Sequence, residues 1–168
     1  MIAEELDNVN RENIILSDPI KNSIMQYSNF YKLIYSNEYL SLNGLFILFK
    51  LNDLNQTKEK ILFTNKNNEE TIQKIIVLEE YILNLIYSNK NKVYKISDLF
   101  SNGFIKYCYN DYTKDSDIDT NKDNINYINN NSSDSKFFIL KISGLWETKD
   151  NIGITFKIIL IDKCIEFV

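Results

Sequence analysis

Hydrophobic and polar residues alternate most regularly between Phe137 and Ile161. A two-residue period is typical of β-strands, in which successive side chains point to opposite faces of a sheet. The polar stretch 147–151 (ETKDN) interrupts the alternation and favours a turn of about 3–5 residues. The pattern therefore predicts an antiparallel hairpin. One face of it is apolar and comprises Phe138, Leu140, Ile142, Ile152, Ile154, Phe156, Ile158 and Leu160.

Three more strands are predicted in the first part of the chain. Tyr31, Leu33 and Tyr35 share one face of the first strand, which ends at the turn-like residues 36–38. The continuous apolar run from residue 45 to 49 predicts a second strand that is covered on both sides. Residues 61–64 form a candidate third strand.

The hydrophobic period changes to that of a helix after residue 67. Asn67 or Asn68 can cap this helix, and Glu69 and Glu70 in its first turn oppose the positive end of the helix dipole. Apolar residues then recur at helical spacing, including Ile72, Ile75, Ile76, Leu83 and Ile86. The pattern predicts a helix of about five turns that ends near residue 88. Residues 93–96 and 104–109 again favour strands, with a short helical turn near residue 99.

The order of these elements predicts an α+β fold that is mainly antiparallel β-sheet. Three strands, one long helix and further strands match an OB-like barrel or a curved sheet, with the helix between the third and fourth strands. Residues 1–22 are acidic and predict a loose lead-in to a single domain at residues 23–168. Residues 110–135 have no period, low hydrophobicity and excess acid, which predicts a flexible acidic, Asn-rich insertion.

The formal net charge of −4 is distributed unevenly along the chain. Residues 1–29 carry −3 and residues 110–135 carry −4, so the remainder of the chain carries +3. A mildly basic body with acidic appendages is compatible with a polyanionic partner, although it lacks a strong basic stripe.

The composition argues against an enzyme. The chain has no histidine, so it lacks the commonest general base near neutral pH and any Ser–His or Cys–His pair. It also lacks a CxxC motif and a glycine-rich phosphate loop. Asp115, Asp117 and Asp119 have the spacing of a calcium-loop start, but the required Gly and closing Glu are absent. We therefore expect no catalytic residues, no cofactor and no metal site.

Two features bear on the cellular compartment. Cys108 and Cys164 are isolated thiols, which favours a reducing, intracellular setting. The acidic N-terminus lacks the apolar run of a secretory signal, and no window approaches the roughly 20 apolar residues that span a bilayer. We expect an intracellular protein without a membrane partner.

The polar face of the predicted hairpin is the best candidate for a binding surface. Sheets that bind single-stranded nucleic acid offer aromatic platforms for bases and cations or hydroxyls for phosphates. The candidates are Lys141, Ser143, Trp146, Lys149, Thr155 and Lys157 on the hairpin, with Tyr31, Lys32 and Tyr35 on the first strand. Alternating Lys and Thr are also the ordinary outer face of a strand, and Tyr or Trp often closes a core.

Two segments of the hairpin, SGLW at residues 143–146 and GITFK at residues 153–157, resemble a recurring motif of small viral proteins. That family is encoded by nucleocytoplasmic large DNA viruses, and most of its members are uncharacterised. Residues 22–49 and 75–83 resemble other segments of the family. The resemblance implies a viral protein of the host cytoplasm, viral factory or virion, and it extends more weakly to viral single-stranded DNA-binding proteins.

Two functional hypotheses follow. The first is a non-enzymatic module that binds single-stranded nucleic acid, DNA or RNA, in a viral replication or packaging system. The second is a structural or protein-interaction subunit of a virion or replication complex, whose partners are other viral proteins or further copies of the chain. Fold-level analogy does not decide between the two hypotheses.

Overall fold

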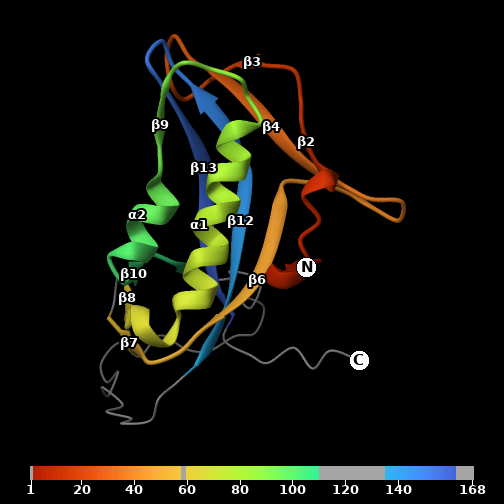
Figure 1. Cartoon of the computed structure of the whole chain (residues 1–168). Coiled ribbons are helices and arrows are strands. Elements are labelled where there is room, and N and C mark those ends of the chain that lie inside the picture. The colour runs from red at the N-terminus through yellow and green to blue at the C-terminus, as the bar shows by residue number, and fades with distance from the viewer. Residues whose placement is uncertain (1, 58–59, 110–134, 162–168) are drawn as a thin grey trace, which may run out of the picture.

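The computed structural model describes residues 2–57, 60–109 and 135–161, which form an α+β fold (Figure 1). The strands are β1 (Glu4–Glu5), β2 (Ile14–Leu16), β3 (Ile20–Lys21), β4 (Asn29–Ser36), β5 (Ser41–Asn43), β6 (Leu45–Leu51), β7 (Leu54–Gln56), β8 (Ile61–Phe63), β9 (Asn91–Val93), β10 (Phe104–Ile105), β11 (Cys108–Tyr109), β12 (Lys136–Glu147) and β13 (Asn151–Ile161). The helices are α1 (Glu69–Asn84) and α2 (Lys95–Ser101), with 3-10 turns η1 (Leu6–Asn8), η2 (Arg11–Asn13) and η3 (Asn65–Asn67). The predicted α+β class is confirmed.

The hairpin of β12 and β13 is the centre of the larger sheet. The two strands pair antiparallel from Phe137 opposite Ile161 to Glu147 opposite Ile152, so the predicted hairpin is confirmed. On its other edge, β12 pairs first with β6 and then with β4. Strands β1, β9 and β11 add parallel pairings, which makes the sheet mixed. Within the described parts of the chain, β1 and β11 end the main strand order and the sheet does not close into a barrel.

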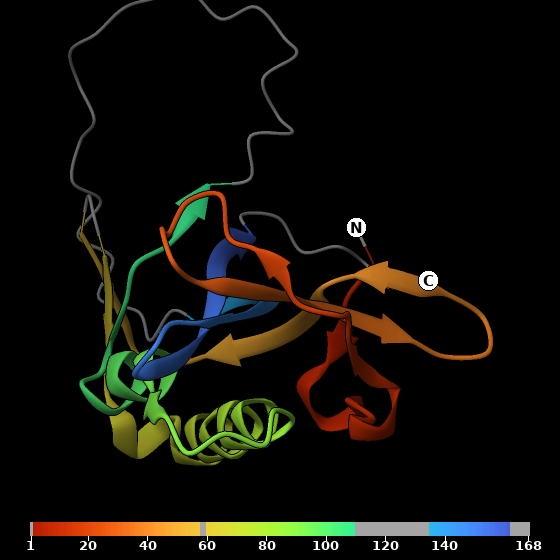
Figure 2. The same cartoon turned by 90° about the horizontal axis from the view of Figure 1, so that it is seen from above.

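Helix α1 covers one face of this sheet (Figure 2). Its buried residues recur every three or four positions, as in Ile72, Ile75, Leu78 and Ile82, which confirms the helix predicted from the period. They pack against the inner face of the predicted hairpin, on which Phe138, Leu140 and Ile158 are at most 2% exposed. Apolar side chains between helix and sheet therefore form the core.

Hydrogen bonds explain why both ends of α1 differ from the prediction. Asn68 occupies the N-cap position, but its side chain bonds to the backbone N–H and C=O of Asn52 instead of capping the helix. At the other end, the N–H of Leu85 donates to the carbonyl of Ile82, which tightens the last turn and ends the helix at Asn84.

A second helix replaces part of the strand predicted at residues 93–96. Glu79 of α1 is 1% exposed, and its carboxylate accepts hydrogen bonds from the backbone N–H groups of Ile96 (3.0 Å) and Ser97 (2.6 Å). These N–H groups lie in the first turn of α2, where no carbonyl within the helix can accept them. An acceptor that lies 17 and 18 residues from these two donors in the sequence therefore permits a helix where local composition favours a strand.

Two further predictions concern the N-terminal residues 1–22 and the insertion at residues 110–135. Residues 1–22, expected as a loose lead-in, include β1, η1, η2, β2 and β3, and Ile14 is buried. Strands β7, β8 and β10 form a second, three-stranded sheet. The predicted insertion at 110–135 lies outside the described residues except for Ser135.

Candidate nucleic-acid interface

Strand β12 changes neighbour at Gly144. It pairs with β6 up to Ile142 and with β4 from Gly144 onward, and the register with β13 shifts between the same two residues. A Cβ atom on Gly144 would lie 2.1 Å from the carbonyl oxygen of Tyr31 on β4, closer than any side chain tolerates. The glycine of the SGLW motif is therefore what lets β4 join the sheet at this point, and Ser143 occupies the irregularity.

The indole of Trp146 lies against Gly153 on the neighbouring strand. A Cβ on Gly153 would be 2.3 Å from Cζ2 of the indole, so only glycine leaves room for the ring. The Lys95 ammonium lies 6.0 Å from the ring centroid, at the outer limit of a cation–π contact. The tryptophan and the glycine of the two sequence motifs thus have a common packing role.

The sheet face turned away from α1 carries a group of lysines, here called the lysine face. Lys141 and Lys157 are direct cross-strand partners, although like charges directly opposite one another destabilise a sheet. Lys32 and Thr155 both lie opposite Gly144, in the next row along the strands. Together with Lys50, these residues (Lys32, Lys50, Lys141, Thr155 and Lys157) define the lysine face.

Aromatic residues alternate with these lysines. The Lys141 Nζ lies 4.9 Å from the ring centroid of its cross-strand partner Phe46, and the Lys50 Nζ lies 5.8 Å from that of Phe137. Phe137 remains 38% exposed. The arrangement places aromatic rings beside cations, which are the two components of a single-strand binding surface. Ile139 and Ile159 lie on the same face between these rows and are only 5% and 4% exposed.

The lysine face carries little opposing charge. In the ranges 2–57, 60–109 and 135–161, no described carboxylate forms an ion pair with Lys32, Lys50, Lys141 or Lys157. The carboxylate in register with this face is Glu5, on the edge strand β1 opposite Leu48. Around Lys141 and Lys157 the face is therefore locally basic. At Lys50 and Phe137 it borders a groove that Glu5, Asp7 and Glu70 also line.

The structure does not bring all nine predicted site residues together. Tyr31 and Tyr35 lie on the opposite, α1-facing side of the sheet, so they are not part of the lysine face. Tyr35 is 2% exposed, and its hydroxyl oxygen accepts a hydrogen bond from the Asn10 N–H (3.4 Å). The two-residue period of β4 separates Lys32 from its tyrosine neighbours. Lys149 lies in the exposed β12–β13 turn at the end of the face.

Four further residues on the side of the sheet away from α1 were not predicted as site residues, namely Phe30, Phe46, Lys50 and Phe137. The alternation in β4 and β6 contains the necessary signal, because Phe30 alternates with Tyr31 and Lys50 with Phe49. Assigning them to one face also requires the strand register, which the sequence does not reveal.

Tyr31 belongs to a polar network on the inner side of the hairpin end. Its hydroxyl donates to Glu147 Oε2 (2.8 Å), and the Lys90 ammonium contacts Glu147 Oε1 at 2.9 Å. Burial by itself would raise the pKa of Glu147, but the hydrogen bonds from Lys90 and Tyr31 outweigh it and lower this pKa. Burial, with the hydrogen bond to Glu147, raises the pKa of Tyr31. The network is an ionised carboxylate held by the side chains of Lys90, Tyr31 and Asn29.

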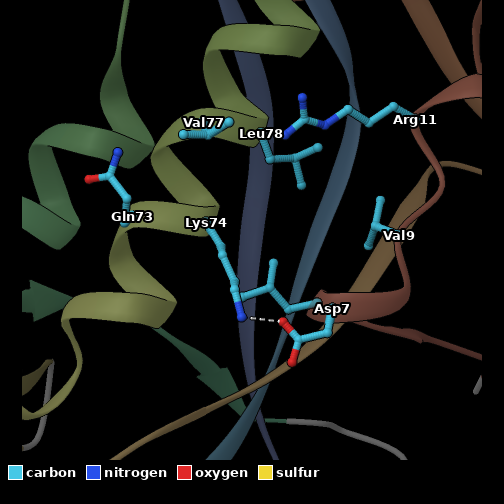
Figure 3. Close-up of a pocket in the computed structure, with 8 residues that line it drawn as sticks. Asp7, Val9, Arg11, Gln73, Lys74, Val77 and Leu78 are labelled. Carbon is cyan, nitrogen blue, oxygen red and sulfur yellow. Dashed lines mark hydrogen bonds and ion pairs between the residues drawn. The ribbon is translucent and has the colours of Figure 1, made fainter.

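Other kinds of site receive less support from the described part of the chain. It contains no cluster of three or more His, Cys, Asp or Glu side chains suited to a metal ion. None of the helices it includes is long and apolar enough to cross a membrane. A groove of about 280 Å³ lies between the N-terminal segment and α1, and Lys74 spans it to Asp7 at 2.6 Å (Figure 3). Leu6, Val9 and Val77 make the groove partly apolar.

Comparison of the chain with protein-family models, with curated proteins and with solved structures finds no match.

Proposed function

We propose that the protein binds single-stranded nucleic acid, without catalysis, through the lysine face. The observation that carries the proposal is the direct pairing of Lys141 with Lys157, next to Lys32 and between aromatic side chains. A bound phosphate backbone would neutralise the repulsion between the paired ammonium groups. In this proposal, phosphate binding offsets the electrostatic cost of placing Lys141 opposite Lys157.

The form of the face favours a single strand over a duplex. Phe46 and Phe137 each lie beside a lysine, and aromatic rings on a sheet surface stack most readily on bases that are unpaired. The sheet would act as an OB-like platform in this proposal. A place in viral replication or packaging rests on the resemblance of the SGLW and GITFK segments.

A salt titration with a labelled oligonucleotide tests the proposal. The association constant should fall steeply with salt, by a slope of about 0.7 per phosphate contact in a plot of log K against log salt. The Lys141→Ala, Lys157→Ala double variant should bind more weakly and lower that slope by about 1.4.

The matched control is Lys60→Ala, Lys66→Ala, which removes two exposed lysines near the second sheet and the start of α1. It removes the same charge from the molecule but none from the lysine face, so its slope should stay close to that of the wild type. Absence of binding at low salt would refute the function. An equal loss in both double variants would refute the site.

A second candidate function is a protein-interaction subunit, favoured by the β4–β5 hairpin. This hairpin projects from the body of the molecule (Figure 2), and Tyr39 at its tip is 85% exposed. Light scattering distinguishes this function, since it predicts a defined oligomer that is indifferent to oligonucleotide and is weakened by Tyr39→Ala.

A further inference from the structure

The loop between β3 and β4 holds large apolar side chains in solvent. Tyr27 is 97% exposed, Ile24 is 93% exposed and Met25 is 38% exposed. Isolated exposed apolar residues are common on protein surfaces, but three of them within four positions form a local cluster. An exposed apolar cluster of this kind is typical of a binding surface.

The exposure does not come from a lack of defined structure in the loop. The Asn22 Oδ1 accepts hydrogen bonds from the N–H groups of Ile24 (3.0 Å) and Met25 (3.2 Å), and the Ser28 Oγ donates to the Met25 carbonyl (2.7 Å). The Asn22 N–H donates to the Ser28 carbonyl and closes the loop. Tyr27 has φ of 57°, a left-handed conformation that is uncommon for a bulky residue. The backbone thus holds the Tyr27 ring outward.

The loop continues one end of the lysine face. Strand pairing aligns Ile20 with Phe30, Phe30 with Trp146, and Trp146 with Gly153, which forms one apolar row across β3, β4, β12 and β13. The neighbouring row on the same face contains Lys32 and Thr155. Figures 1 and 2 place the β3–β4 loop at this end of the sheet, on the side away from α1.

We infer that the β3–β4 loop and the Phe30–Trp146 row form the base-contacting end of the interface, with Tyr27 stacking on an unpaired nucleobase. This inference rests on the proposed function and assigns phosphates and bases to different residues of the interface. The lysines contact phosphates, which every sequence presents, and the rings of Tyr27, Phe30 and Trp146 contact bases. The occupant is a nucleobase because the cluster is aromatic and continuous with a cationic surface, so the same strand can reach both.

Two oligomers of equal length separate the two roles: an oligothymidylate and its abasic counterpart, which keeps the phosphates and lacks the bases. Wild-type protein should bind the oligothymidylate more tightly. Tyr27→Ala should weaken oligothymidylate binding by about 5- to 160-fold, the range for loss of one stacked base, and leave abasic binding unchanged. Tyr27→Phe keeps the ring and should bind as the wild type does.

Tyr39→Ala is the matched control, because Tyr39 is similarly exposed at the tip of the other hairpin. It should leave binding of both oligomers unchanged. Trp146 is the single tryptophan of the chain, so its fluorescence should be quenched by the oligothymidylate and not by the abasic oligomer.

The outcomes separate this inference from the function on which it rests. Wild-type binding of both oligomers with equal affinity, or an unchanged Tyr27→Ala, overturns the stacking role and leaves a phosphate-binding lysine face. Failure of the wild type to bind either oligomer at low salt overturns the proposed function itself. Equal weakening by Tyr27→Ala for both oligomers also overturns stacking, because the abasic strand has no base to stack.

Discussion

Glu147 shows how one side chain combines a structural role with a position beside the interface. It follows Trp146 directly, yet its carboxylate points to the opposite side of the sheet and is held there by Lys90 and Tyr31. Its side chain is 11% exposed and that of Lys90 is 30% exposed, so the ion pair is partly removed from solvent. An ion pair with that degree of burial affects stability far more when one partner is removed than an exposed pair does.

Glu147→Gln should lower the free energy of unfolding at pH 7 by about 1–3 kcal/mol. The pKa of Glu147 is lower in the folded than in the unfolded protein, so ionisation stabilises the fold above the unfolded value of about 4.3. That stabilisation is lost as the pH falls through the folded pKa. Urea unfolding should therefore show the difference between wild type and variant shrinking below about pH 4.

Glu38→Gln is the control for this pH dependence, because Glu38 is an exposed glutamate in the β4–β5 turn. Its effect on the free energy of unfolding should be within about 0.5 kcal/mol at each pH. A Glu147→Gln effect that is independent of pH would contradict the role of the ionised carboxylate.

At the residue scale, part of the candidate site follows from the sequence and part does not. Lys141, Thr155 and Lys157 alternate with apolar residues in a hairpin, which is enough to place them on one face. The position of Tyr31 is not determined in this way, because both faces of β4 contain aromatic residues. Only the pairing of Tyr31 with Leu145 shows that it faces α1.

At the scale of elements, the start of α2 depends on a contact with α1, whereas its later residues include the short helical turn predicted near residue 99. The carboxylate of Glu79 satisfies the N–H groups of Ile96 and Ser97, and it also accepts a hydrogen bond from the Ser97 hydroxyl. Helix α1 is predictable because its signals are local, namely a period of 3.6 residues and acidic residues in the first turn. The start of α2 is not predictable in this way, because its acceptor belongs to another helix.

Glu79→Gln should destabilise the fold by about 2–3 kcal/mol. A glutamine offers one oxygen in place of two, so its amide group would face a backbone N–H and leave a buried donor without an acceptor. Glu80→Gln makes the same change at the adjacent, exposed position and should cost less than about 0.5 kcal/mol. Chemical denaturation of both variants gives the measurement, and equal effects would contradict the capping role.

At the scale of the whole molecule, positive and negative charges are concentrated in different parts of the chain. The lysine face is locally basic, whereas the chain has a formal net charge of −4, of which residues 110–135 supply as much as the total. Long-range repulsion between these carboxylates and a nucleic acid would oppose binding at low ionic strength and be screened as salt rises.

Replacing the six aspartates of this stretch by asparagine tests that opposition, and the positions are Asp111, Asp115, Asp117, Asp119, Asp123 and Asp134. The change removes six negative charges and takes the formal net charge from −4 to +2. Oligonucleotide affinity should rise by about tenfold at low salt, and the gain should shrink as salt increases. An unchanged affinity, with an unchanged thermal unfolding midpoint, would contradict a repulsive role.

Overall architecture was predictable only as far as local signals reach. The long hairpin and α1 define an α+β domain, but the change of partner at Gly144 depends on two strands, β4 and β6, that meet β12 end to end. No alternation of hydrophobic residues encodes which strand lies beside which. Which strands pair with β12, and whether the sheet closes, depend on contacts between parts of the chain that are distant in sequence.

The shared position of β12 has a consequence for how the molecule opens. Because β12 bonds to β13 along one edge and to β6 and β4 in turn along the other, separation of any one neighbour leaves it paired elsewhere. Its interior amides can reach solvent only when several strands separate together, which makes β12 part of the last cooperative unit to unfold. A ligand on the lysine face would thus bind to the most persistent part of the protein, whereas β3 and β5 pair with β4 alone and can separate first.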